Sequence, residues 1–386
     1  MKIQLPYSKQ SINDEDITAV TEALKSPIIT RGPQMEAFEQ EFAEYCGAQF
    51  AVAFCNASAG LAAAYFAADV KKGDKIISTP NTFVASVGTA VQRGAQTVFI
   101  DIDFKTGNVD LEQFVINGSL PLSRGKAILA PVHFAGLPVD MELLDQQLAN
   151  PETMIVEDAA HALGTSYPRG GPRVGSCRWS HMTVFSFHPV KNITTGEGGM
   201  VTTNSEELAH ALRLFRNNGI ERDPAFLEER ATPWYYEVQT LTNNTFMTEM
   251  QAALGRSQLK RLEQFLTKKR RLMQFYRDQL KEHPAIQLLS DAYDEHTGFH
   301  LCVAHIDFDK LGIKREDLML KLREKGIGTQ VHYIPLYRHP AFKRMYGDLT
   351  EYFPEMEKHY AQALSLPLFY EMEEKDVRFV VENLRA

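Results

Sequence analysis

Short apolar stretches alternate with amphipathic stretches along the first half of the chain. The apolar stretches predict strands at residues 50–54, 75–79, 98–102, 127–132, 154–156 and 183–187. Apolar residues at helical spacing, with Ser11 or Asn13 as the first N-cap, predict helices at 14–25, 35–45, from Ser58 onward and at 83–92. Strands that alternate with helices form a mostly parallel sheet covered on both faces, so we predict an α/β fold. Ligands of such sheets bind at the carboxyl ends of the strands.

The pattern changes near Thr248. Residues 248–283 form one long charged stretch with helical spacing, and its basic run at 268–271 predicts a solvated helix face. Beyond it we predict a strand at 299–306, a helix at 314–325, a strand at 328–333 and two further helices. This second part has the pattern of a smaller α+β unit. We therefore predict a large domain over residues 1–250 and a small C-terminal domain over residues 251–386.

Composition and charge narrow the classes of protein that remain. The chain has 386 residues, of which 44% are hydrophobic, so it can bury a large core and whole-chain disorder is excluded. A net charge of −8 argues against a dedicated nucleic-acid binder. The four cysteines lie far apart and form no Cys-x-x-Cys pair, which argues against a zinc site or a disulfide framework and favours a reducing, cytoplasmic location.

Two stretches bear on targeting to a membrane. The opening sequence MKIQLPYSKQ has no apolar segment of signal-peptide length. Residues 51–70 reach about the length of a membrane span, but Asn56, Ser58 and Gly60 interrupt the first half and Asp69 ends it. A short strand, a polar turn and a buried helix explain this segment better, so we expect no membrane association.

A lysine in a glycine-rich turn is the first candidate for chemistry. Residues 186–199 read SFHPVKNITTGEGG, so Lys191 follows a strand end and precedes Gly196, Gly198 and Gly199. A lysine in a sheltered pocket loses its proton and forms a Schiff base with a carbonyl. Ser186 places a hydroxyl near it that suits a phosphate. The alternative to a catalytic role is a solvated surface charge, which is more common for a single lysine in a loop.

A carboxylate and a histidine follow the strand at 154–156. Asp158 lies at the carboxyl edge of the sheet in the segment MIVEDAAHALG. A pyridoxal phosphate enzyme needs a carboxylate against the pyridinium nitrogen, because a protonated ring is the better electron sink. His161 lies one turn further on, where it can contact the cofactor ring or the substrate. The alternatives are an N-cap role for Asp158 and a packed structural role for His161.

The turn after the first strand suits an anion. The N–H groups at the start of the next helix and the helix dipole bind phosphates, and Ser58 adds a hydroxyl, although it could be a plain N-cap. Phe83 opens another predicted helix and could stack on a flat ring or lie in the core. Residues 56–60 also echo the G-x-S-x-G motif of serine hydrolases with Ser58 as nucleophile, but the first glycine is missing and no motif places a histidine and an aspartate. No G-x-G-x-x-G motif follows the first strand, which argues against a nicotinamide enzyme.

In combination, SFHPVKNITTGEGG, VEDAAHALG and NTFVAS resemble the DegT-type sugar aminotransferases. These are pyridoxal phosphate enzymes of the aspartate aminotransferase fold (fold type I). The resemblance covers nearly the whole chain and includes PYSKQSI, IITRGP, MTEMQAALGRSQL and GIGTQVHYIPLY. The motif SFHPVK with ITT-x-EGG, together with PWYYE at 233–237, is most similar to family members of pseudaminic acid biosynthesis. A sister branch that performs dehydration carries histidine where this chain has Lys191.

The resemblance implies an activity and an assembly. The activity is transfer of an amino group from glutamate to the C4 ketone of a UDP-linked 4-keto-6-deoxy-N-acetylhexosamine. Another nucleotide-linked 3- or 4-keto sugar stays open as the substrate, as do the stereochemistry of the sugar and the amino donor. The implied assembly is a cytoplasmic homodimer with shared active sites and no metal.

The resemblance also implies a role for each matching position. Lys191 would bind the cofactor covalently and move the proton, Asp158 would hold the ring nitrogen and Phe83 would stack on the ring. Ala57, Ser58 and Ser186 would bind the phosphate, and Asn244 would reach the phosphate of the neighbouring subunit's cofactor. The nucleotide-sugar pocket would be lined by Tyr7, Pro27, Ile28, Ile29, Thr30, Gln330, Val331, His332 and Tyr333.

The chain departs from the family pattern in two places. The family commonly reads Gly-x-Asn-Tyr-Arg-Met where this chain has TNNTFM at 242–247, so the asparagine remains while Thr245 and Phe246 replace tyrosine and arginine. This change puts the sugar-phosphate contacts or the strength of the subunit interface in doubt. The turn before the third helix reads Ala-Ser where the family more often has Gly-Thr, which keeps a hydroxyl.

Overall fold

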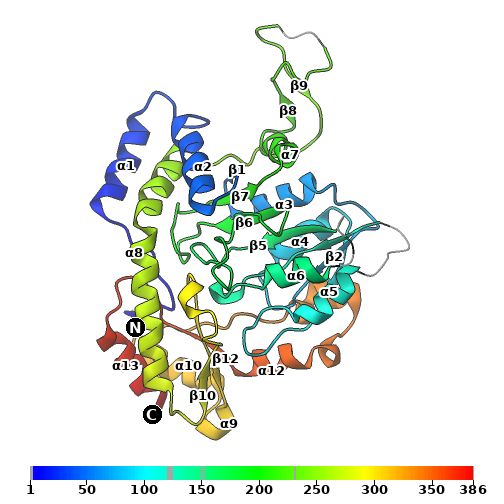
Figure 1. Cartoon of the computed structure of the whole chain (residues 1–386). Coiled ribbons are helices and arrows are strands. Elements are labelled where there is room, and N and C mark those ends of the chain that lie inside the picture. The colour runs from blue at the N-terminus through cyan, green and yellow to red at the C-terminus, as the bar shows by residue number, and fades with distance from the viewer. Residues whose placement is uncertain (1–2, 120–124, 149, 151–152, 230–231, 386) are drawn as a thin grey trace.

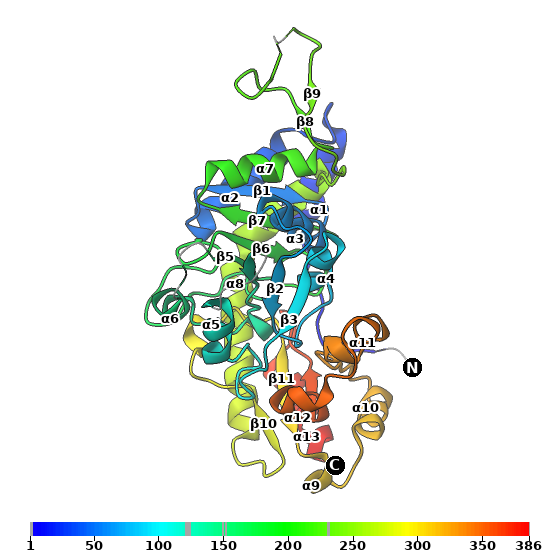
Figure 2. The same cartoon turned by 90° about the vertical axis from the view of Figure 1, so that its right-hand side faces the viewer.

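A seven-stranded sheet forms the centre of the larger part of the molecule (Figures 1 and 2). The computed structural model describes residues 3–119, 125–148, 150, 153–229 and 232–385. The sheet has the order β1 (Phe50–Phe54), β7 (Gly199–Thr203), β6 (Met182–Ser186), β5 (Met154–Asp158), β4 (Ala127–Leu129), β2 (Lys75–Ser78) and β3 (Gln96–Phe99). β7 runs antiparallel to β1 and β6, and the other neighbouring pairs are parallel. The prediction of a mostly parallel α/β sheet is confirmed.

Helices cover both faces of this sheet, because successive side chains of a strand point to opposite faces. Val52 and Phe54 of β1 pack in one apolar cluster with residues of α3, α4 and α7, whereas Ala51 and Ala53 pack in another with residues of α2 and α8. The helices of this part are α1 (Asp14–Lys25), α2 (Pro33–Cys46), α3 (Ala57–Ala67), α4 (Ala85–Gln92), α5 (Leu111–Ser119), α6 (Met141–Gln147), α7 (Glu206–Arg216) and α8 (Glu249–Leu280).

Several details of the larger part differ from the predictions. The strand predicted at 98–102 is β3 at Gln96–Phe99, the strand predicted at 127–132 ends at Leu129, and α5, α6 and α7 were not predicted. The helix predicted over 83–92 begins at Ala85, so Phe83 lies in the preceding turn. β7 was not predicted, although its residues GMVTT are fully buried and pair with both neighbours. The glycines of the preceding turn predict a loop, and they do not indicate where the loop ends and β7 begins.

Asn13 is the N-cap of the first helix, and its side chain accepts a hydrogen bond from the Asp16 N–H.

The C-terminal part contains a second, antiparallel sheet. Its three strands are β10 (Ile286–Leu288), β11 (Cys302–Ile306) and β12 (Ala363–Leu366), and its helices are α9 (Phe308–Leu311), α10 (Arg315–Glu324), α11 (Pro340–Tyr346), α12 (Pro354–Gln362) and α13 (Glu374–Arg385). The predicted strand at 328–333 is wrong. These residues pair with the sheet only through an isolated bridge between Gln330 and Ser365, and the edge of the sheet is taken by β12.

The long helix α8 connects the two parts of the molecule (Figure 1). It packs against α1 and α2 near its start and against α13 further along. Because α8 begins at Glu249 and is continuous, a boundary after residue 250 cuts its first turn, and the division into two domains stays a prediction.

The basic run 268–271 of α8 is not a solvated face throughout. Lys268 and Arg271 form ion pairs with Glu373 and Glu374, as surface charges do. Lys269, in contrast, is buried. It lies in the same helical stripe as the buried Leu262, Leu266 and Leu272, so the helical phase turns it inward, and the prediction is wrong at this residue.

The apolar segment at 51–70 folds as expected from its polar interruptions. It forms β1, a turn and α3, which is buried between the sheet and its neighbouring helices. Among the described residues, no helix is both long and apolar enough to cross a membrane.

A buried carboxylate ties α8 to the start of α2. The Glu249 side chain is 1% exposed and accepts hydrogen bonds from the backbone N–H groups of Gly32, Gln34 and Met35, at 3.0, 2.7 and 3.1 Å. These groups lack helical partners at a helix start, so the carboxylate satisfies them and interacts favourably with the helix dipole. This contact holds the segment before α2, which includes the predicted substrate residues 27–30.

Replacing Glu249 with alanine is expected to lower the free energy of unfolding by about 2 kcal/mol, because three buried N–H groups lose their acceptor. Urea denaturation followed by circular dichroism measures this loss. Glu249→Gln keeps one carbonyl oxygen at the same place and should lose clearly less. Equal stability of Glu249→Ala and the unmodified protein would show that solvent replaces the carboxylate.

Candidate active site

A cavity of about 540 Å³ opens at the carboxyl ends of the parallel strands. β5 ends at Asp158, β6 ends at Ser186 and the turn after β1 leads into α3, so three strand ends contribute to its wall. The cavity is lined by Tyr7, Asn56, Ala57, Ser58, Leu61, Thr82, Phe83, Ala85, Val132, Asp158, Ala160, His161, Ser186, His188, Val190, Lys191, Glu197, His300, His332 and Tyr333.

Lys191 enters this cavity from the loop between β6 and β7. Burial lowers the pKa of its amine from 10.5 to about 8, although the nearby Asp158 carboxylate acts to raise it. A lysine with a pKa in this range is partly neutral near pH 7, and a neutral amine can act as a nucleophile or a base. Gly199 lets the loop pass close to the turn before α3, because a Cβ atom there would lie 2.7 Å from the Ala57 nitrogen.

Asp158 is held as a fixed carboxylate in the cavity wall. It is 5% exposed, and its two oxygens accept hydrogen bonds from the Ser86 hydroxyl at 2.5 Å and the Ala160 N–H at 3.0 Å. Ser86 is itself in contact with the Thr82 hydroxyl at 2.6 Å. These bonds orient Asp158 and still leave lone pairs on both oxygens for a cationic or N–H group in the cavity.

His161 is a neutral donor rather than a cation. Burial lowers the pKa of its imidazole well below 6.5, and the positive charge of Lys191 lowers it further. Its Nδ1 accepts a hydrogen bond from the Ala135 N–H at 3.3 Å, so the proton of the neutral ring is on Nε2. Nε2 lies 3.0 Å from the Tyr333 hydroxyl and donates to it. The Tyr333 proton is then available to a group in the cavity.

The start of α3 offers an anion site. Asn56 caps the helix by accepting a hydrogen bond from the Ala59 N–H at 2.8 Å. The N–H groups of Ala57 and Ser58 in the first turn have no helical acceptor, and the hydroxyls of Ser58 and Ser186 line the same cavity. In the described part of the chain no histidine is hydrogen-bonded to the Ser58 hydroxyl, so the hydrolase alternative has no activated nucleophile.

Phe83 presents its ring to the cavity. Its side chain is 58% exposed, which is unusual for a phenylalanine, and it lines the cavity that also contains Asp158 and Lys191. A flat ring with a phosphate, an aldehyde and a ring nitrogen finds a stacking surface, an anion site, an amine and a carboxylate here. The residues present therefore fit pyridoxal phosphate.

Several residues with an implied role do not line this cavity. Residues 27–30 lie at the surface before α2, with Ile29 hydrogen-bonded to Glu249 through the backbone. Gln330 lines a separate groove beside α10, and Val331 lines neither. Asn244 is exposed and lies in a bridge with Asn217. The structure of the single chain does not bring these residues to Lys191.

His300 belongs to the cavity but carries no motif in the sequence. It is 2% exposed, its ring lies 4.4 Å from that of His161, and its Nδ1 has no hydrogen-bond partner within the described residues. Ser86 was also missed, because it acts only by holding Asp158. His300 lies within the strand predicted at 299–306 and two residues before the observed β11, so no motif sets it apart, and only the fold brings it to the site.

Phe246, which departs from the family pattern, lies between two arginines. The guanidinium carbons of Arg31 and Arg216 lie 4.1 and 4.7 Å from its ring centroid. Arg216 is buried and forms an ion pair with Glu39. The Phe246 ring therefore interacts with two cationic side chains.

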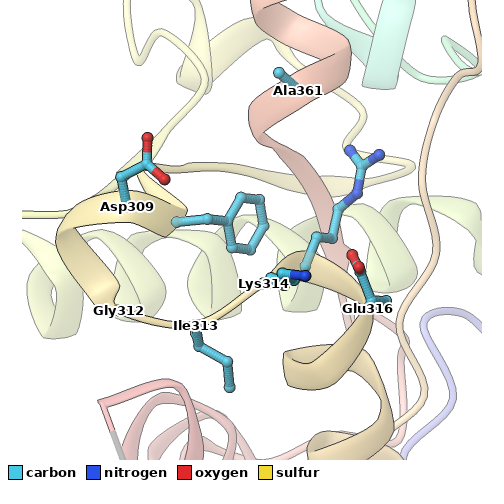
Figure 3. A pocket seen from close by; sticks show the side chains of 8 residues that line it. Asp309, Gly312, Ile313, Lys314, Glu316 and Ala361 are labelled. Carbon is cyan, nitrogen blue, oxygen red and sulfur yellow. The ribbon is translucent and has the colours of Figure 1, made fainter.

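A second hollow, on the C-terminal part, lacks this chemistry. A hollow of about 460 Å³ beside α9 and α10 is lined by Phe308, Asp309, Gly312, Ile313, Lys314, Arg315, Glu316 and Ala361 (Figure 3). Its charged side chains of both signs are typical of an ordinary surface. Within the described ranges, no cluster of three or more histidine, cysteine, aspartate or glutamate side chains could hold a metal ion.

Comparison with known proteins gives consistent matches over the whole chain. A model of the DegT/DnrJ/EryC1/StrS aminotransferase family matches residues 10–385. The spore coat polysaccharide biosynthesis protein SpsC of Bacillus subtilis is 36% identical over 385 residues, which are 99% of this chain and 96% of SpsC.

Solved structures share the fold as well. Helicobacter pylori PseC, an aminotransferase involved in the biosynthesis of pseudoaminic acid, superimposes with a TM-score of 0.88 and 28% identity over 98% of both chains. Spr1654 of Streptococcus pneumoniae in its PLP-form has a TM-score of 0.86 and 25% identity, covering 99% of this chain and 97% of that chain. DesI, solved in the presence of its TDP-sugar product, has a TM-score of 0.85 and 28% identity, covering 100% of this chain and 93% of that chain.

Proposed function

Because this chain belongs to the DegT/DnrJ/EryC1/StrS aminotransferase family, a family of sugar aminotransferases, we propose that it uses pyridoxal phosphate to aminate a nucleotide-linked keto sugar. The proposed reaction moves the amino group of glutamate to the C4 ketone of a UDP-linked 4-keto-6-deoxy-N-acetylhexosamine, in pseudaminic acid biosynthesis. The observation that carries the proposal is the meeting of Lys191, Asp158 and the α3 anion site in one cavity.

The candidate residues of the cavity have separate tasks in this reaction. When bound, the cofactor supplies an electron sink for the bond that is broken at the amino-bearing carbon. Asp158, whose oxygens Ser86 and Ala160 orient, would hold the ring nitrogen of the bound cofactor. Lys191 supplies the amine that holds the cofactor and then moves the proton as a general base. The N–H groups of α3 and the hydroxyls of Ser58 and Ser186 bind the phosphate, and Phe83 covers the ring.

The Tyr333 hydroxyl and His161 act together on the substrate side. His161 donates to Tyr333, so the tyrosine proton points to a further acceptor such as a sugar oxygen or a carboxylate. His332 and Tyr7 complete this wall with rings 5.3 Å apart. The similarity to PseC, an aminotransferase involved in the biosynthesis of pseudoaminic acid, supports the proposed pathway, while the TDP-sugar of DesI keeps another nucleotide-linked 3- or 4-keto sugar open.

The site is proposed to be completed by a second copy of the chain. The hairpin of β8 (Ile220–Glu221) and β9 (Glu237–Val238) projects from the body near α7 (Figures 1 and 2). Its arm exposes large apolar side chains, with Trp234 at 77% and Leu241 at 92% exposure, and Asn244 follows it. Because exposed apolar patches indicate a protein interface, we propose that this arm contacts a second copy and that Asn244 and residues 27–30 reach its cavity.

A mixture of two inactive variants tests the shared site. If Asn244 of one protomer serves the cavity of the other, a dimer of Lys191→Ala and Asn244→Ala chains has one site with both residues intact. Unfolding and refolding the two variants together should restore up to about a quarter of the activity by random pairing. Mixing two Lys191→Ala preparations is the control. No recovery, with mixed dimers demonstrated by differently tagged chains, would place Asn244 in its own protomer's site or in none.

The pKa of Lys191 predicts how cofactor uptake depends on pH. Because burial lowers this pKa to about 8, the neutral amine is lost as pH falls through 8. The rate at which the cofactor-free protein takes up pyridoxal phosphate should therefore fall about tenfold for each pH unit below 8 and level off above it. Stopped-flow absorbance measures this rate. A midpoint near 10.5 would mean that Lys191 is an ordinary solvated lysine.

The proposed cofactor chemistry is tested by trapping. Protein loaded with pyridoxal phosphate should show a visible absorption band that borohydride removes, and peptide mass spectrometry should find the added mass on Lys191. A serine hydrolase would show neither. A trapped cofactor on any other lysine would contradict the assignment of Lys191.

A further inference from the structure

A second buried lysine contacts the loop between β6 and β7 that carries Lys191, called the catalytic loop below. Lys269 of α8 is 4% exposed, and its Nζ donates a hydrogen bond to the Asn192 Oδ1 at 2.9 Å. Asn192 directly follows Lys191 in the chain. Lys191, Asn192 and Lys269 also line one small hollow on the side of the loop that faces α8.

Asn192 is fixed by this contact and by two others. Its Nδ2 donates to the carbonyl oxygens of Leu163 and Gly298, at 2.8 and 2.9 Å. With both hydrogens of the amide used in this way, its oxygen is the group left to face Lys269. Hydrogen bonds therefore hold both the oxygen and the nitrogen of the Asn192 amide. Because Asn192 is the next residue after Lys191, they also hold the backbone that carries Lys191.

The charge of Lys269 has no close counter-ion. No carboxylate of the described residues forms an ion pair with its ammonium, whose hydrogen-bond partner is the neutral Asn192 amide. Burial lowers the pKa of Lys269 to about 8, so the amine is largely protonated at pH 7. Burying a charge without an ion-pair partner is costly, so the position of Lys269 indicates a role that an apolar side chain could not fill.

We propose that Lys269 is a positioning residue for Lys191, which fixes the catalytic loop through Asn192 and opposes a second positive charge on the Lys191 nitrogen. Other charged and titratable groups act on the same two amines. The Asp158 carboxylate favours the charged form of Lys191 from the cavity side, and Glu371 favours that of Lys269 from the C-terminal side. His300 is neutral, because burial and the two lysines lower the pKa of its imidazole.

The direction of the effect follows from Coulomb's law. A positive charge at Lys269 disfavours a proton on Lys191, so it increases the fraction of neutral amine near pH 7. The catalytic purpose of this coupling rests on the proposed function. The coupling itself is between two amines of the protein and needs no cofactor. It makes Lys191 more reactive towards a carbonyl group.

The test compares three variants of the full-length chain. Lys269→Met removes both the charge and the hydrogen bond, and Lys269→Gln keeps a donor for Asn192 without the charge. Lys268→Met is the matched control, because it removes a neighbouring charge that is paired with Glu373 at the surface. For each cofactor-free protein, the rate of Lys191 acetylation by an amine-reactive ester is measured from pH 6 to 11 by peptide mass spectrometry.

The midpoint of Lys191 reactivity should rise by about one pH unit in Lys269→Met and Lys269→Gln, which means about tenfold less neutral amine at pH 7. It should stay unchanged in Lys268→Met. The visible spectrum of the cofactor-loaded protein should show the same upward shift in its pH titration. Folding of each variant is checked by circular dichroism, and Lys269→Gln serves if Lys269→Met does not fold.

An unchanged midpoint in a folded Lys269 variant would overturn the inference, as would an equal shift in Lys268→Met. These outcomes are separable from a failure of the proposed function. If the protein did not bind pyridoxal phosphate at all, the acetylation profile of the cofactor-free protein would still show whether the two lysines are coupled.

Discussion

Replacing Lys191 with alanine is expected to lower kcat by about 10,000-fold or more, with little change in stability. The lysine both holds the cofactor and moves the proton, and loss of a general base alone costs up to about 10,000-fold. No other described lysine lines the cavity, so no side chain is in place to take over. Turnover with glutamate and a UDP-4-keto sugar measures the loss.

Two controls separate this effect from misfolding. The circular dichroism spectrum and melting curve of Lys191→Ala should match those of the unmodified protein, because the residue lies in a cavity wall and carries no core packing. Lys268→Ala, which removes a surface lysine, should keep full activity. Added small amines should restore part of the lost rate. Full activity of Lys191→Ala without added amine would end the assignment.

Asp158→Asn is expected to lower kcat/KM by about 100- to 1,000-fold, the range seen when one electrostatic contact to a developing charge is lost. The amide has the same shape: its oxygen can accept from the Ala160 N–H, and its NH2 group would then donate to the Ser86 hydroxyl, which reverses that hydrogen bond. The change therefore removes the negative charge with little change in packing. The ring nitrogen then loses the partner that keeps it protonated. Steady-state kinetics measures the loss.

This variant has a second, independent readout. Asp158 acts to raise the pKa of Lys191, so removing its charge should move the midpoint of cofactor uptake below 8. Ser86→Ala is the matched control, because it removes one hydrogen bond to Asp158 and leaves the charge. It should lose less than about tenfold in kcat/KM. An Asp158→Asn protein with unchanged kcat/KM would show that the carboxylate does not serve the cofactor.

Strand ends and motif residues made the centre of the site predictable. A parallel sheet brings the carboxyl ends of its strands to one edge, so Asp158, Ser186 and the turn before α3 had to meet there once the strands were identified. Lys191 followed from its glycine-rich loop. These residues follow their strands closely in the sequence. The local pattern of apolar and polar residues is therefore enough to predict that they lie at this edge of the sheet.

Residues placed by packing between distant segments were not predictable. Lys269 belongs to a basic run that is typical of a solvated face, and only the contact of α8 with the catalytic loop shows that it is buried. His300 reaches the cavity from the C-terminal part, which follows α8. Residues 328–333, predicted as a strand, pair with the sheet only at the bridge from Gln330 to Ser365, and the Tyr333 N–H donates to Asn81 Oδ1 of the distant larger part.

The identity of the product tests the central proposal most directly. The protein, loaded with pyridoxal phosphate, is incubated with glutamate and UDP-4-keto-6-deoxy-N-acetylhexosamines of both configurations, and the products are identified by NMR. The proposal predicts a UDP-linked sugar with an amino group on C4 and an equal amount of 2-oxoglutarate. A 3-amino product, or no aminated product from any UDP-sugar, would contradict it.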